Sequence, residues 1–495
     1  MRVLLVNAVA RIYREFYAGD AYTTFPAGIL SIAAVLEQHG HEVKILDGCI
    51  DSREPKDFTD FKPDIVGFSV ITGPNLDGSI AQTKELKEVL PDAKVIWGNV
   101  HPSVLPEQTL VEPYIDYLAI GAGEYTLLEL IQHLESGSPK TEEIKGLAYK
   151  KDGQIFINEP RPFIDNLEGL PDPAWHLVDI NKYSVIGLNT SRGCPRRCGF
   201  CYNKSYNRGY AGYVPADKII SQIEYFQKNY GTKYFRFQED NFTFNLKRLR
   251  EFCNILIERK MKLTWSCDSR ADLKEEDVAL MAKSGCISVG LGLETGSPRM
   301  LDFIKKDVSV AQMEKTFWAF VKNKIRTSVY IIYGFPSETA EDLRLTHKML
   351  ERLDNPYYMY NRYFPFPGSA LFDYCAANGL IDPPTKLEEW AGFITWHSHE
   401  GNVSNVPQEI IDETEHRWRT SYAFQRVRFT MKHDPSYFWT IITNPIKFFR
   451  ELRELIKYST HTRKIHKIAL KMYPESPTKP KDATPIATER EKVHS

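Results

Sequence analysis

Short apolar runs of strand length alternate with helix-like stretches in two separate series along the chain. In the first series the strand-like runs begin at Val3, Val43, Ile65, Lys94 and Tyr117, with helical spacing between them. This alternation favours a parallel sheet covered by helices, because each helix returns the chain to the same end of the sheet. The series predicts an α/β front domain with a doubly wound, five-stranded parallel sheet. Its ligand-binding loops are expected beyond the carboxyl ends of the strands.

The second series contains six βα units and predicts a partial (βα)6 TIM-like barrel, with its chemistry at the carboxyl ends of the strands. Its strands are expected near residues 185–189, 234–237, 264–267, 288–293, 328–333 and 358–364. A short hairpin and a Pro-rich connector separate the two series. The predicted organisation is an α/β domain over 1–140, a linker over 141–184, the barrel over 185–383, a helical basic and aromatic C-terminal domain over 384–472, and a disordered tail over 473–495.

The charges cancel over the whole chain but not within its parts. The chain has 63 Lys+Arg against 64 Asp+Glu, whereas residues 417–471 hold 13 basic and 3 acidic residues, a net charge of +10. An amphipathic helical cap on the barrel is the first interpretation of this segment, and a membrane-surface helix is the second. Nucleic acid is the least favoured partner, since no RNA-binding motif accompanies the charge. With no apolar run of about 18 residues and no leader pattern, we expect a cytoplasmic protein, with peripheral membrane contact through 417–471 as the alternative.

Three of the eight cysteines fall within eight residues. They are Cys194, Cys198 and Cys201, separated by three and then two residues. Three thiolates on one tight loop can hold three irons of a 4Fe-4S cube and leave the fourth iron open to another ligand. Structural zinc would need four N or S ligands, which this region does not offer at zinc-finger spacing. Buried thiols on an ordinary loop are the remaining alternative, and the Gly and Arg neighbours make that loop a poor core segment.

The segment 191–203, with Phe200 before the last cysteine, resembles the signature of the radical S-adenosylmethionine (SAM) enzymes. The resemblance extends over about 185–372. It implies an oxygen-sensitive 4Fe-4S cluster, bound by Cys194, Cys198 and Cys201, whose open iron is chelated by SAM. It also implies reductive cleavage of SAM to a 5′-deoxyadenosyl radical, with an external one-electron donor of the flavodoxin or ferredoxin type.

The same resemblance implies a set of SAM contacts. Glu239 or Asp240 is expected at the amino group, although the sequence Gln-Glu-Asp departs from the Gly-Gly-Glu form of many members, so either acid could serve. An acidic acceptor suits an ammonium group, and the planar fork of arginine suits a carboxylate. The candidate SAM-binding residues are Phe200, Glu239, Asp240, Ser269, Arg270, Gly292 and Glu294.

An α/β domain in front of this barrel resembles the cobalamin-binding class of the superfamily. Glycines at the strand ends would let the backbone pass close to a large flat ligand. The candidate cobalamin-binding residues are Ser69, Thr72, Gly98, His101, Gly121, Gly123 and Glu124. Residues 7–38 contain no histidine, so the lower face of the cobalt is expected to lack a His ligand, and His101 is either a contact around the cobalamin or a polar loop residue. The methylthiotransferase branch is excluded, because residues 1–193 contain only Cys49.

The resemblance implies an enzyme that uses both cofactors. The leading hypothesis is a methyltransferase that acts on an unactivated carbon or on phosphorus of a small or lipophilic substrate. An anaerobic oxidative cyclase of the porphyrin-ring type, or a C–C bond-forming relative without methyl transfer, is the alternative within the family. A non-catalytic corrinoid or cluster carrier is the alternative outside it. Tyr330, Tyr333 and Tyr363 are candidates for the substrate pocket, although aromatic residues at alternate strand positions also serve as core.

Overall fold

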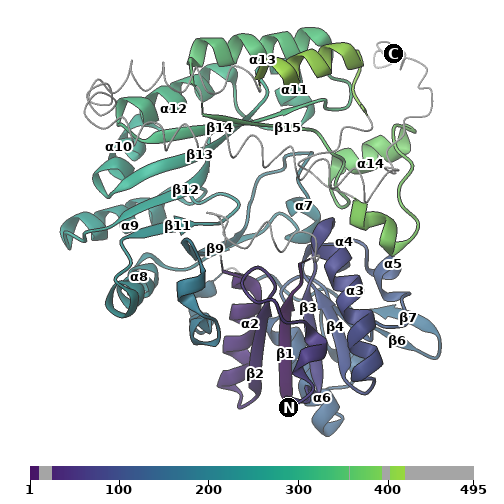
Figure 1. The fold of residues 1–495 in the computed structure, drawn as a ribbon. Helices are drawn as coiled ribbons and strands as arrows, with labels where there is room; N and C mark the ends of the chain where they lie inside the picture. The colour runs from purple at the N-terminus through teal and green to yellow at the C-terminus, as the bar shows by residue number, and fades with distance from the viewer. Residues whose placement is uncertain (10–24, 165, 356, 393–401, 419–495) are drawn as a thin grey trace, which may run out of the picture.

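Two sheets carry the fold of this protein (Figure 1). The computed structural model describes residues 1–9, 25–164, 166–355, 357–392 and 402–418. The first sheet has seven strands in the order β2-β1-β3-β4-β5-β6-β7, and the first five of them run parallel. Its strands are β1 (Arg2–Asn7), β2 (Glu42–Asp47), β3 (Ile65–Ser69), β4 (Lys94–Gly98), β5 (Tyr117–Ala119), β6 (Leu147–Lys151) and β7 (Gln154–Ile157).

The prediction of a five-stranded front sheet is wrong by two strands. The hairpin of β6 and β7, expected in the linker, pairs antiparallel with β5, and Tyr117 lies opposite Tyr149. An exposed parallel edge leaves backbone donors and acceptors unpaired, and this hairpin satisfies those of β5. The rings of Tyr149 and Phe156 also stack at 5.5 Å between the two hairpin strands.

Helices cover both faces of the parallel part of this sheet. In β1 the side chains alternate, so Val3 and Leu5 join one core cluster while Leu4 and Val6 join another. The first cluster includes α2 (Ala27–Gln38) and α6 (Glu124–Ser136), which pack together, and the second includes α3 (Pro74–Val89). The helices α4 (Val100–Val104) and α5 (Pro106–Leu110) follow β4.

The second sheet has six parallel strands, and each strand neighbours the next one along the chain. The strands are β8 (Ile186–Leu188), β11 (Tyr234–Phe237), β12 (Thr264–Arg270), β13 (Cys286–Glu294), β14 (Arg326–Tyr333) and β15 (Tyr358–Arg362). The helices between and after them are α8 (Ala216–Tyr230), α9 (Leu246–Glu258), α10 (Glu275–Lys283), α11 (Pro298–Phe303), α12 (Val310–Lys322), α13 (Ala340–Leu353) and α14 (Ala370–Ala377). The prediction of an α/β chain built on parallel sheets is therefore confirmed.

Local sequence sets where several of these helices begin and end. The Asn245 side chain accepts a hydrogen bond from the Arg248 amide and starts α9. Thr339 and Asp342 form a reciprocal capping box at the start of α13. Gly231, at φ 64°, ends α8 in the left-handed conformation that glycine adopts without steric cost. Short 3-10 helices occur at η1 (Pro55–Phe58), η2 (Thr141–Glu143), η3 (Leu167–Gly169), η4 (Trp175–Leu177), η5 (Ile180–Lys182) and η6 (Leu387–Gly392).

Two small elements lie between the sheets. The strands β9 (Ser191–Gly193) and β10 (Ala211–Tyr213) form a separate antiparallel pair, and the segment that connects them carries the three clustered cysteines and α7 (Asn203–Tyr206). Helix α7 packs against α4 of the front domain (Figure 1). The cysteine loop therefore lies at the junction of the two sheets.

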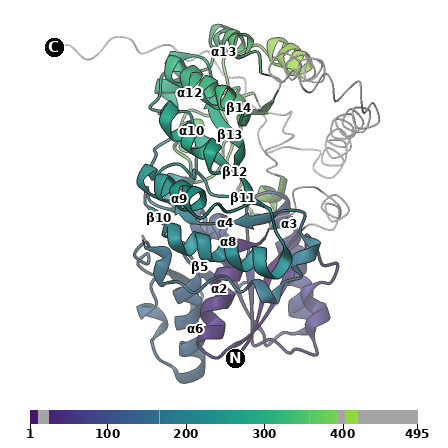
Figure 2. The same cartoon turned by 90° about the vertical axis from the view of Figure 1, so that its left-hand side faces the viewer.

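The two sheets share one apolar core through the connector that precedes β8. The Phe25 ring lies 4.7 Å from that of Tyr183 and 5.9 Å from that of Phe226 on α8. Trp175 packs against Phe226 at 4.8 Å, and the Tyr183 hydroxyl donates to Asp47 Oδ2 at 2.8 Å. Figure 2 shows α8 next to the front domain. This buried contact fixes the front domain against the second sheet.

A helix over residues 408–418 covers the last strands of the second sheet. The Trp418 ring packs 5.4 Å from Tyr333 and 5.3 Å from Tyr360, and Glu415 accepts hydrogen bonds from Tyr333 and from Arg362, the latter at 2.9 Å. The helix over 408–418 thus covers these strands, but only its last two residues, Arg417 and Trp418, belong to the basic segment 417–471, so the cap interpretation of that segment stays a prediction. The rest of the basic segment and the predicted tail lie outside the described residues. Among those described, no helix has the length and hydropathy needed to cross a membrane.

Candidate active site

Backbone hydrogen bonds fix the cysteine loop to the end of α11 and to the start of α14. It follows β9, beyond the carboxyl end of β8, and the Cys201 amide donates to the Cys198 carbonyl at 3.1 Å. Gly199 donates its amide to the Ile304 carbonyl at 2.8 Å and accepts from the Leu371 amide at 2.9 Å. All three cysteines are free and partly exposed. The loop is therefore ordered while its thiols stay accessible.

The three thiols lie within electrostatic range of one another. Burial, together with the nearby Asp240, Cys198 and Cys194, raises the pKa of Cys201 to about 12. Iron binds the thiolate form of cysteine, so binding of a cluster would release the thiol protons of the loop. In the described part of the chain no three acidic, His or Cys side chains converge on one ion. A 4Fe-4S cube presents a separate iron to each thiolate, so its ligands need not converge, and this set of donors fits it.

The two candidate acids after β11 differ in their surroundings. Glu239 is buried, and its Oε1 accepts from the Thr190 amide at 2.8 Å and from the Thr190 hydroxyl. Burial raises the pKa of Glu239 against the effect of Arg248. Asp240 is exposed and accepts a hydrogen bond at 2.7 Å from Nδ2 of Asn203, a residue that directly follows the cysteine loop. The structure thus brings Asp240 next to the cysteines and ties Glu239 to the end of β8.

Ser269 and Arg270 point in different directions from the end of β12. Arg270 Nη1 lies 3.4 Å from Cys198 Sγ, and its Nη2 donates to the Lys306 carbonyl. The Ser269 hydroxyl instead bonds Thr243 Oγ1 at 2.7 Å. Arg270 is therefore the member of the pair that reaches the cysteine loop.

Gly292 and Glu294 lie at the end of β13 beside a buried cation. Lys306 Nζ donates to Glu294 Oε1 at 2.7 Å, and both side chains are buried. A Cβ on Gly292 would lie 2.6 Å from Glu294 Oε1 and 3.1 Å from Lys306 Nζ, so a side chain there would have to displace this ion pair. The Phe200 ring lies 6.0 Å from Lys306 Nζ and 5.8 Å from the Phe335 ring. Lys306 was not among the predicted residues, and no motif in the sequence marks it.

The structure does not gather the three candidate tyrosines into one site. Tyr330 donates to Asp268 Oδ1 at 2.8 Å, and Arg236 bonds the other oxygen of Asp268. Tyr333 bonds Glu415 under the C-terminal helix, and the Tyr363 ring packs 5.2 Å from Phe335. The Arg236–Asp268 pair was also absent from the predicted site residues. The alternation in β11 was the available signal: Phe235 and Phe237 are buried, so Arg236 between them belongs to the opposite face of the sheet.

Several candidate cobalamin residues meet beyond the carboxyl ends of β3 and β4. Thr72 Oγ1 and His101 Nδ1 are 2.9 Å apart, and Asn99 Nδ2 donates to Ser69 Oγ at 3.0 Å. His101 is fully buried, and burial lowers its pKa to about 3, so its imidazole is neutral. Its Nε2 has no hydrogen-bond partner among the described residues. A buried imidazole nitrogen without a partner fits a ligand that carries amide donors.

The loop after β5 offers open space beside glycine. Gly121 has φ 77°, and a Cβ built on it would meet no atom within 4 Å. Gly98 is also at a strand end, where a Cβ would make only ordinary contacts of 3.6 Å with Ala119. Together with the orphaned His101 nitrogen, this edge fits the backbone approach of a large planar cofactor.

Glu124 is held by residues of two other segments. Its Oε1 accepts from Ser31 Oγ at 2.9 Å and from Arg192 Nη2, whereas its Oε2 is buried with no partner in the described ranges. Gly123, its neighbour, lies against Ile32, since a Cβ there would be 3.1 Å from Ile32 Cδ1. No local sequence pattern marks Arg192 as a functional residue, because the glutamate that it binds lies 68 residues earlier in the chain.

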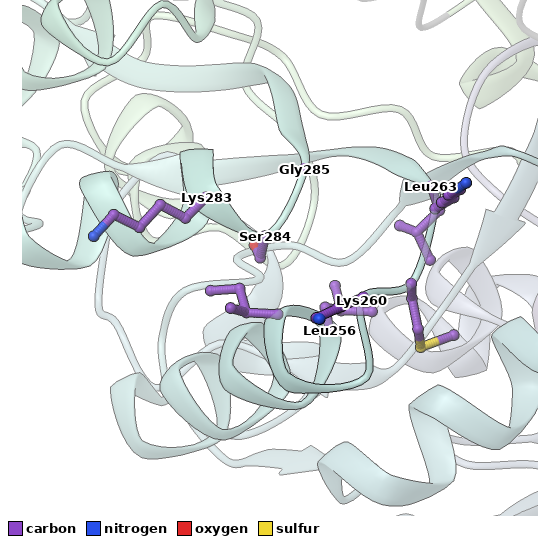
Figure 3. Close-up of a pocket in the computed structure, with 9 residues that line it drawn as sticks. Leu256, Lys260, Leu263, Lys283, Ser284 and Gly285 are labelled. Carbon is purple, nitrogen blue, oxygen red and sulfur yellow. The ribbon is translucent and has the colours of Figure 1, made fainter.

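A pocket of about 280 Å³ lies elsewhere, between the end of α9 and the start of β12 (Figure 3). Its walls include Leu256, Leu263, Ser284 and the exposed Lys260. It opens at the amino ends of the strands, whereas the cysteine loop follows their carboxyl ends, so it is separate from the candidate site.

Two known family models match this chain. The radical SAM superfamily matches residues 188–350, and the B12 binding domain matches residues 18–131. The first range contains β11 to β14 of the second sheet, and the second range contains β2 to β5 of the first sheet.

Curated relatives span most of the chain. An uncharacterized methyltransferase of Pyrococcus horikoshii is 31% identical over 74% of this chain and 84% of its own length. The anaerobic magnesium-protoporphyrin IX monomethyl ester cyclase of Rubrivivax gelatinosus is 30% identical over 75% and 69%, respectively. The cytidylyl-2-hydroxyethylphosphonate methyltransferase of Streptomyces wedmorensis is 26% identical over 82% and 86%.

Solved structures share the fold. The radical SAM methyltransferase TsrM of Kitasatospora setae, with cobalamin and a 4Fe-4S cluster bound, aligns with a TM-score of 0.65 at 19% identity, over 77% of this chain and 76% of its own. The cobalamin-dependent SAM radical enzyme OxsB aligns with a TM-score of 0.64 at 19% identity, over 97% and 74%. With both family models matched and relatives aligned over most of its length, this chain belongs to the cobalamin-dependent radical SAM enzymes.

Proposed function

We propose that this protein transfers a methyl group to an unactivated carbon, or to phosphorus, of a small or lipophilic substrate. When bound, the cluster supplies the electron that cleaves SAM and cobalamin supplies the methyl group. Cys194, Cys198 and Cys201 would hold the cluster, and the edge around Thr72, Gly98, His101 and Gly121 would hold cobalamin. The observation that carries the proposal is the contact of α7, which follows the cysteines directly, with α4, which carries His101.

This contact supports an arrangement in which the two candidate cofactor sites lie beside each other. Both lie beyond the carboxyl ends of their strands, and the shared core around Phe25 and Phe226 holds the sheets in that arrangement. We propose that the substrate binds between the two sites, near Asn203 on α7 and its hydrogen-bond partner Asp240. A group held there is close to the SAM site on one side and to the front domain on the other, so positioning is the main task of these residues.

The relatives favour methyl transfer over ring cyclisation. The chain covers 84% and 86% of the two methyltransferases but 69% of the Rubrivivax cyclase. The test is to incubate reconstituted protein, dithionite, hydroxocobalamin and SAM bearing a deuterated methyl group with a cell extract of a deletion strain. A metabolite that gains the labelled methyl supports the proposal. Label-free oxidation of a metabolite would favour the cyclase alternative instead.

We also propose the finer organisation of the chain. The first sheet would be doubly wound, and the second would curve into a partial (βα)6 barrel. The front domain, predicted over 1–140, would instead end at Ile157, because the hairpin of β6 and β7 pairs with β5. The linker would then run to 184, with the barrel over 185–383 and the helical domain over 384–472. A flavodoxin or ferredoxin would supply electrons, and we propose a cytoplasmic protein whose segment 417–471 contacts membranes if its substrate is lipid-soluble.

Asp240, rather than Glu239, is proposed to bind the SAM amino group. Asp240 is exposed beside the cysteine loop, while Glu239 is engaged by Thr190. Asp240→Asn is expected to raise the dissociation constant of SAM by about tenfold or more, since a hydrogen bond to a charged group contributes about 1.5–3 kcal/mol. Equilibrium dialysis of reconstituted protein with SAM measures this constant.

Glu239→Gln is the matched control for that measurement. It keeps the size of the side chain and an oxygen for the Thr190 donors, so SAM affinity should stay within about threefold of wild type. The opposite ranking, with Glu239→Gln the more damaging change, would contradict the assignment of Asp240.

Cobalamin retention tests the front domain directly. Protein purified in the presence of hydroxocobalamin and then desalted is expected to keep about one equivalent of corrin, measured by its visible absorption. His101→Phe should lower this amount, because the substitution removes the buried Nε2 and also the contact of Nδ1 with Thr72 Oγ1. Colourless wild-type protein after desalting would contradict the cobalamin site.

A further inference from the structure

Arg192 joins the cysteine loop to the front domain. It lies on β9, two residues before Cys194, and its Nη2 donates to Ser31 Oγ at 2.9 Å and to Glu124 Oε1. The Ser31 hydroxyl donates to the same Glu124 oxygen at 2.9 Å. The Glu124 side chain is only 2% exposed. Three segments that are distant in sequence thus meet at one carboxylate oxygen, and we name Ser31, Glu124 and Arg192 the interdomain triad.

The front-domain end of the triad is fixed next to the candidate cobalamin edge. Glu124 is the first residue of α6 and follows the loop of Gly121 and Gly123. A carboxylate at a helix N-terminus is stabilised by the helix dipole, so this position holds the charge in place. Any ligand that orders the glycine loop therefore also orders the carboxylate that Arg192 binds.

At the other end of the triad, the backbone between Arg192 and Cys194 has little conformational freedom. Gly193, between Arg192 and Cys194, has φ 75°, and a Cβ on it would lie 2.3 Å from the Tyr210 carbonyl oxygen. The backbone here is also held by the β9–β10 pairing, in which Arg192 lies opposite Gly212. With the backbone held on both sides of Gly193, we expect a shift of Arg192 that reaches its backbone to be passed on to Cys194.

We infer that the interdomain triad couples the occupancy of the cobalamin edge to the position of the cysteine loop, and so to the affinity of the loop for SAM. The inference rests on the proposed cofactor sites. The apolar contacts of Phe25, Tyr183 and Phe226 already hold the two sheets together, so the triad is not needed for that task. Its members are positioning residues: they act on SAM only through the loop.

The experiment compares SAM affinity with and without hydroxocobalamin. Full-length protein is reconstituted with iron and sulfide, and the dissociation constant of SAM is measured by equilibrium dialysis in both states. Coupled sites typically change each other's affinity by about 5–150-fold. We expect hydroxocobalamin to tighten SAM binding of the wild-type protein by about fivefold or more.

The decisive variant is the double substitution Arg192→Met with Glu124→Gln. It removes both charges together, so no buried charge is left without a partner. Its iron and corrin contents are measured first, and hydroxocobalamin is supplied until the corrin content matches that of the wild type. We then expect a SAM affinity that no longer responds to hydroxocobalamin. Arg192→Lys, which keeps a cation for Glu124, should retain most of the response. If the double variant fails to take up iron, the same comparison is made with Glu124→Gln alone. The deciding quantity is the ratio of the SAM dissociation constants without and with hydroxocobalamin.

Glu129→Gln is the matched control on the same helix. It weakens the ion pair of Glu129 with Arg161, whose Nη1 lies 3.0 Å from Glu129 Oε1, and should leave the response to hydroxocobalamin intact. A double variant with the wild-type response, or a wild type with no response, would overturn the inference. Failure of the wild type to bind the cluster, cobalamin or SAM at all would instead overturn the proposed function.

Discussion

Replacing Cys198 with alanine is expected to abolish both the iron–sulfur absorption and the formation of 5′-deoxyadenosine from SAM. Each of the three loop cysteines would hold a different iron, so two remaining thiolates cannot secure the cube. Arg270 Nη1 also lies 3.4 Å from Cys198 Sγ, so this donor would stand beside the sulfur atom that binds the cluster. The loss should therefore be complete to the detection limit rather than graded. Iron content, visible absorption and chromatography of the nucleoside product after dithionite reduction measure it.

Cys253→Ala is the control for that loss. Cys253 is also a free cysteine but is buried on α9, outside the loop, and burial raises its pKa to about 12. Its removal should cost some stability while leaving cluster content and product formation in place. Product formation by the Cys198→Ala protein at more than a few per cent of wild type would refute the assignment of Cys198 as a ligand.

Replacing Arg248 with methionine is expected to lower the free energy of unfolding of the apoprotein by about 3–5 kcal/mol, because it leaves a buried acid without its cation. Arg248 is only 1% exposed. Its Nη1 donates to the Thr190 carbonyl at 2.7 Å, and its Nη2 donates to the Phe242 carbonyl at 2.9 Å. The guanidinium also lies 4.9 Å from the Phe242 ring centroid and interacts with the buried Glu239. Urea denaturation followed by circular dichroism measures the change.

Arg259→Met provides the comparison near the end of the same helix. Arg259 pairs with Glu224 at 3.1 Å, and both side chains are about half exposed, at 52% and 51%. Surface pairs of this kind contribute about 0–1 kcal/mol, so the substitution should change the free energy of unfolding by less than that. Equal effects of the two substitutions would contradict the role given to burial.

The position of Arg248 explains why its effect should reach the active site. It ties the end of β8, through Thr190, to the loop after β11, through Phe242 and Glu239. Those two strand ends carry the cysteine loop and Asp240. Even where the Arg248→Met protein remains folded, we expect its cluster content to fall below that of Arg259→Met.

Local patterns in the sequence were sufficient for the main architecture. The apolar runs at Val3, Ile65 and Lys94 became β1, β3 and β4, because strand periodicity and burial are both properties of a few adjacent residues. The order of the elements then implied parallel sheets. The hairpin at 147–157 was correctly expected as a hairpin but was assigned to the linker, because its pairing with β5 is a contact between distant segments that no local pattern encodes.

The acids after β11 show the same limit at the level of single side chains. Glu239 and Asp240 are adjacent, and both follow a strand end, so composition alone ranks them equally. The packing of Thr190 and Arg248 around Glu239 separates it from Asp240 beside Asn203. Likewise, only the fold brought Arg270 to Cys198 and turned Ser269 toward Thr243.

The sequence by itself determined the spacing of the three cysteines and the two series of strands and helices, because covalent neighbours and periodic burial fix these features locally. Only the tertiary structure decided that Arg192 meets Ser31 and Glu124, at sequence separations of 161 and 68 residues. Such a contact depends on how two sheets pack, and the packing is settled by the summed burial of residues such as Phe25 and Phe226 rather than by any motif. The local sequence of the cysteine loop thus determines its ligands, whereas its proposed coupling to the front domain depends on the tertiary structure.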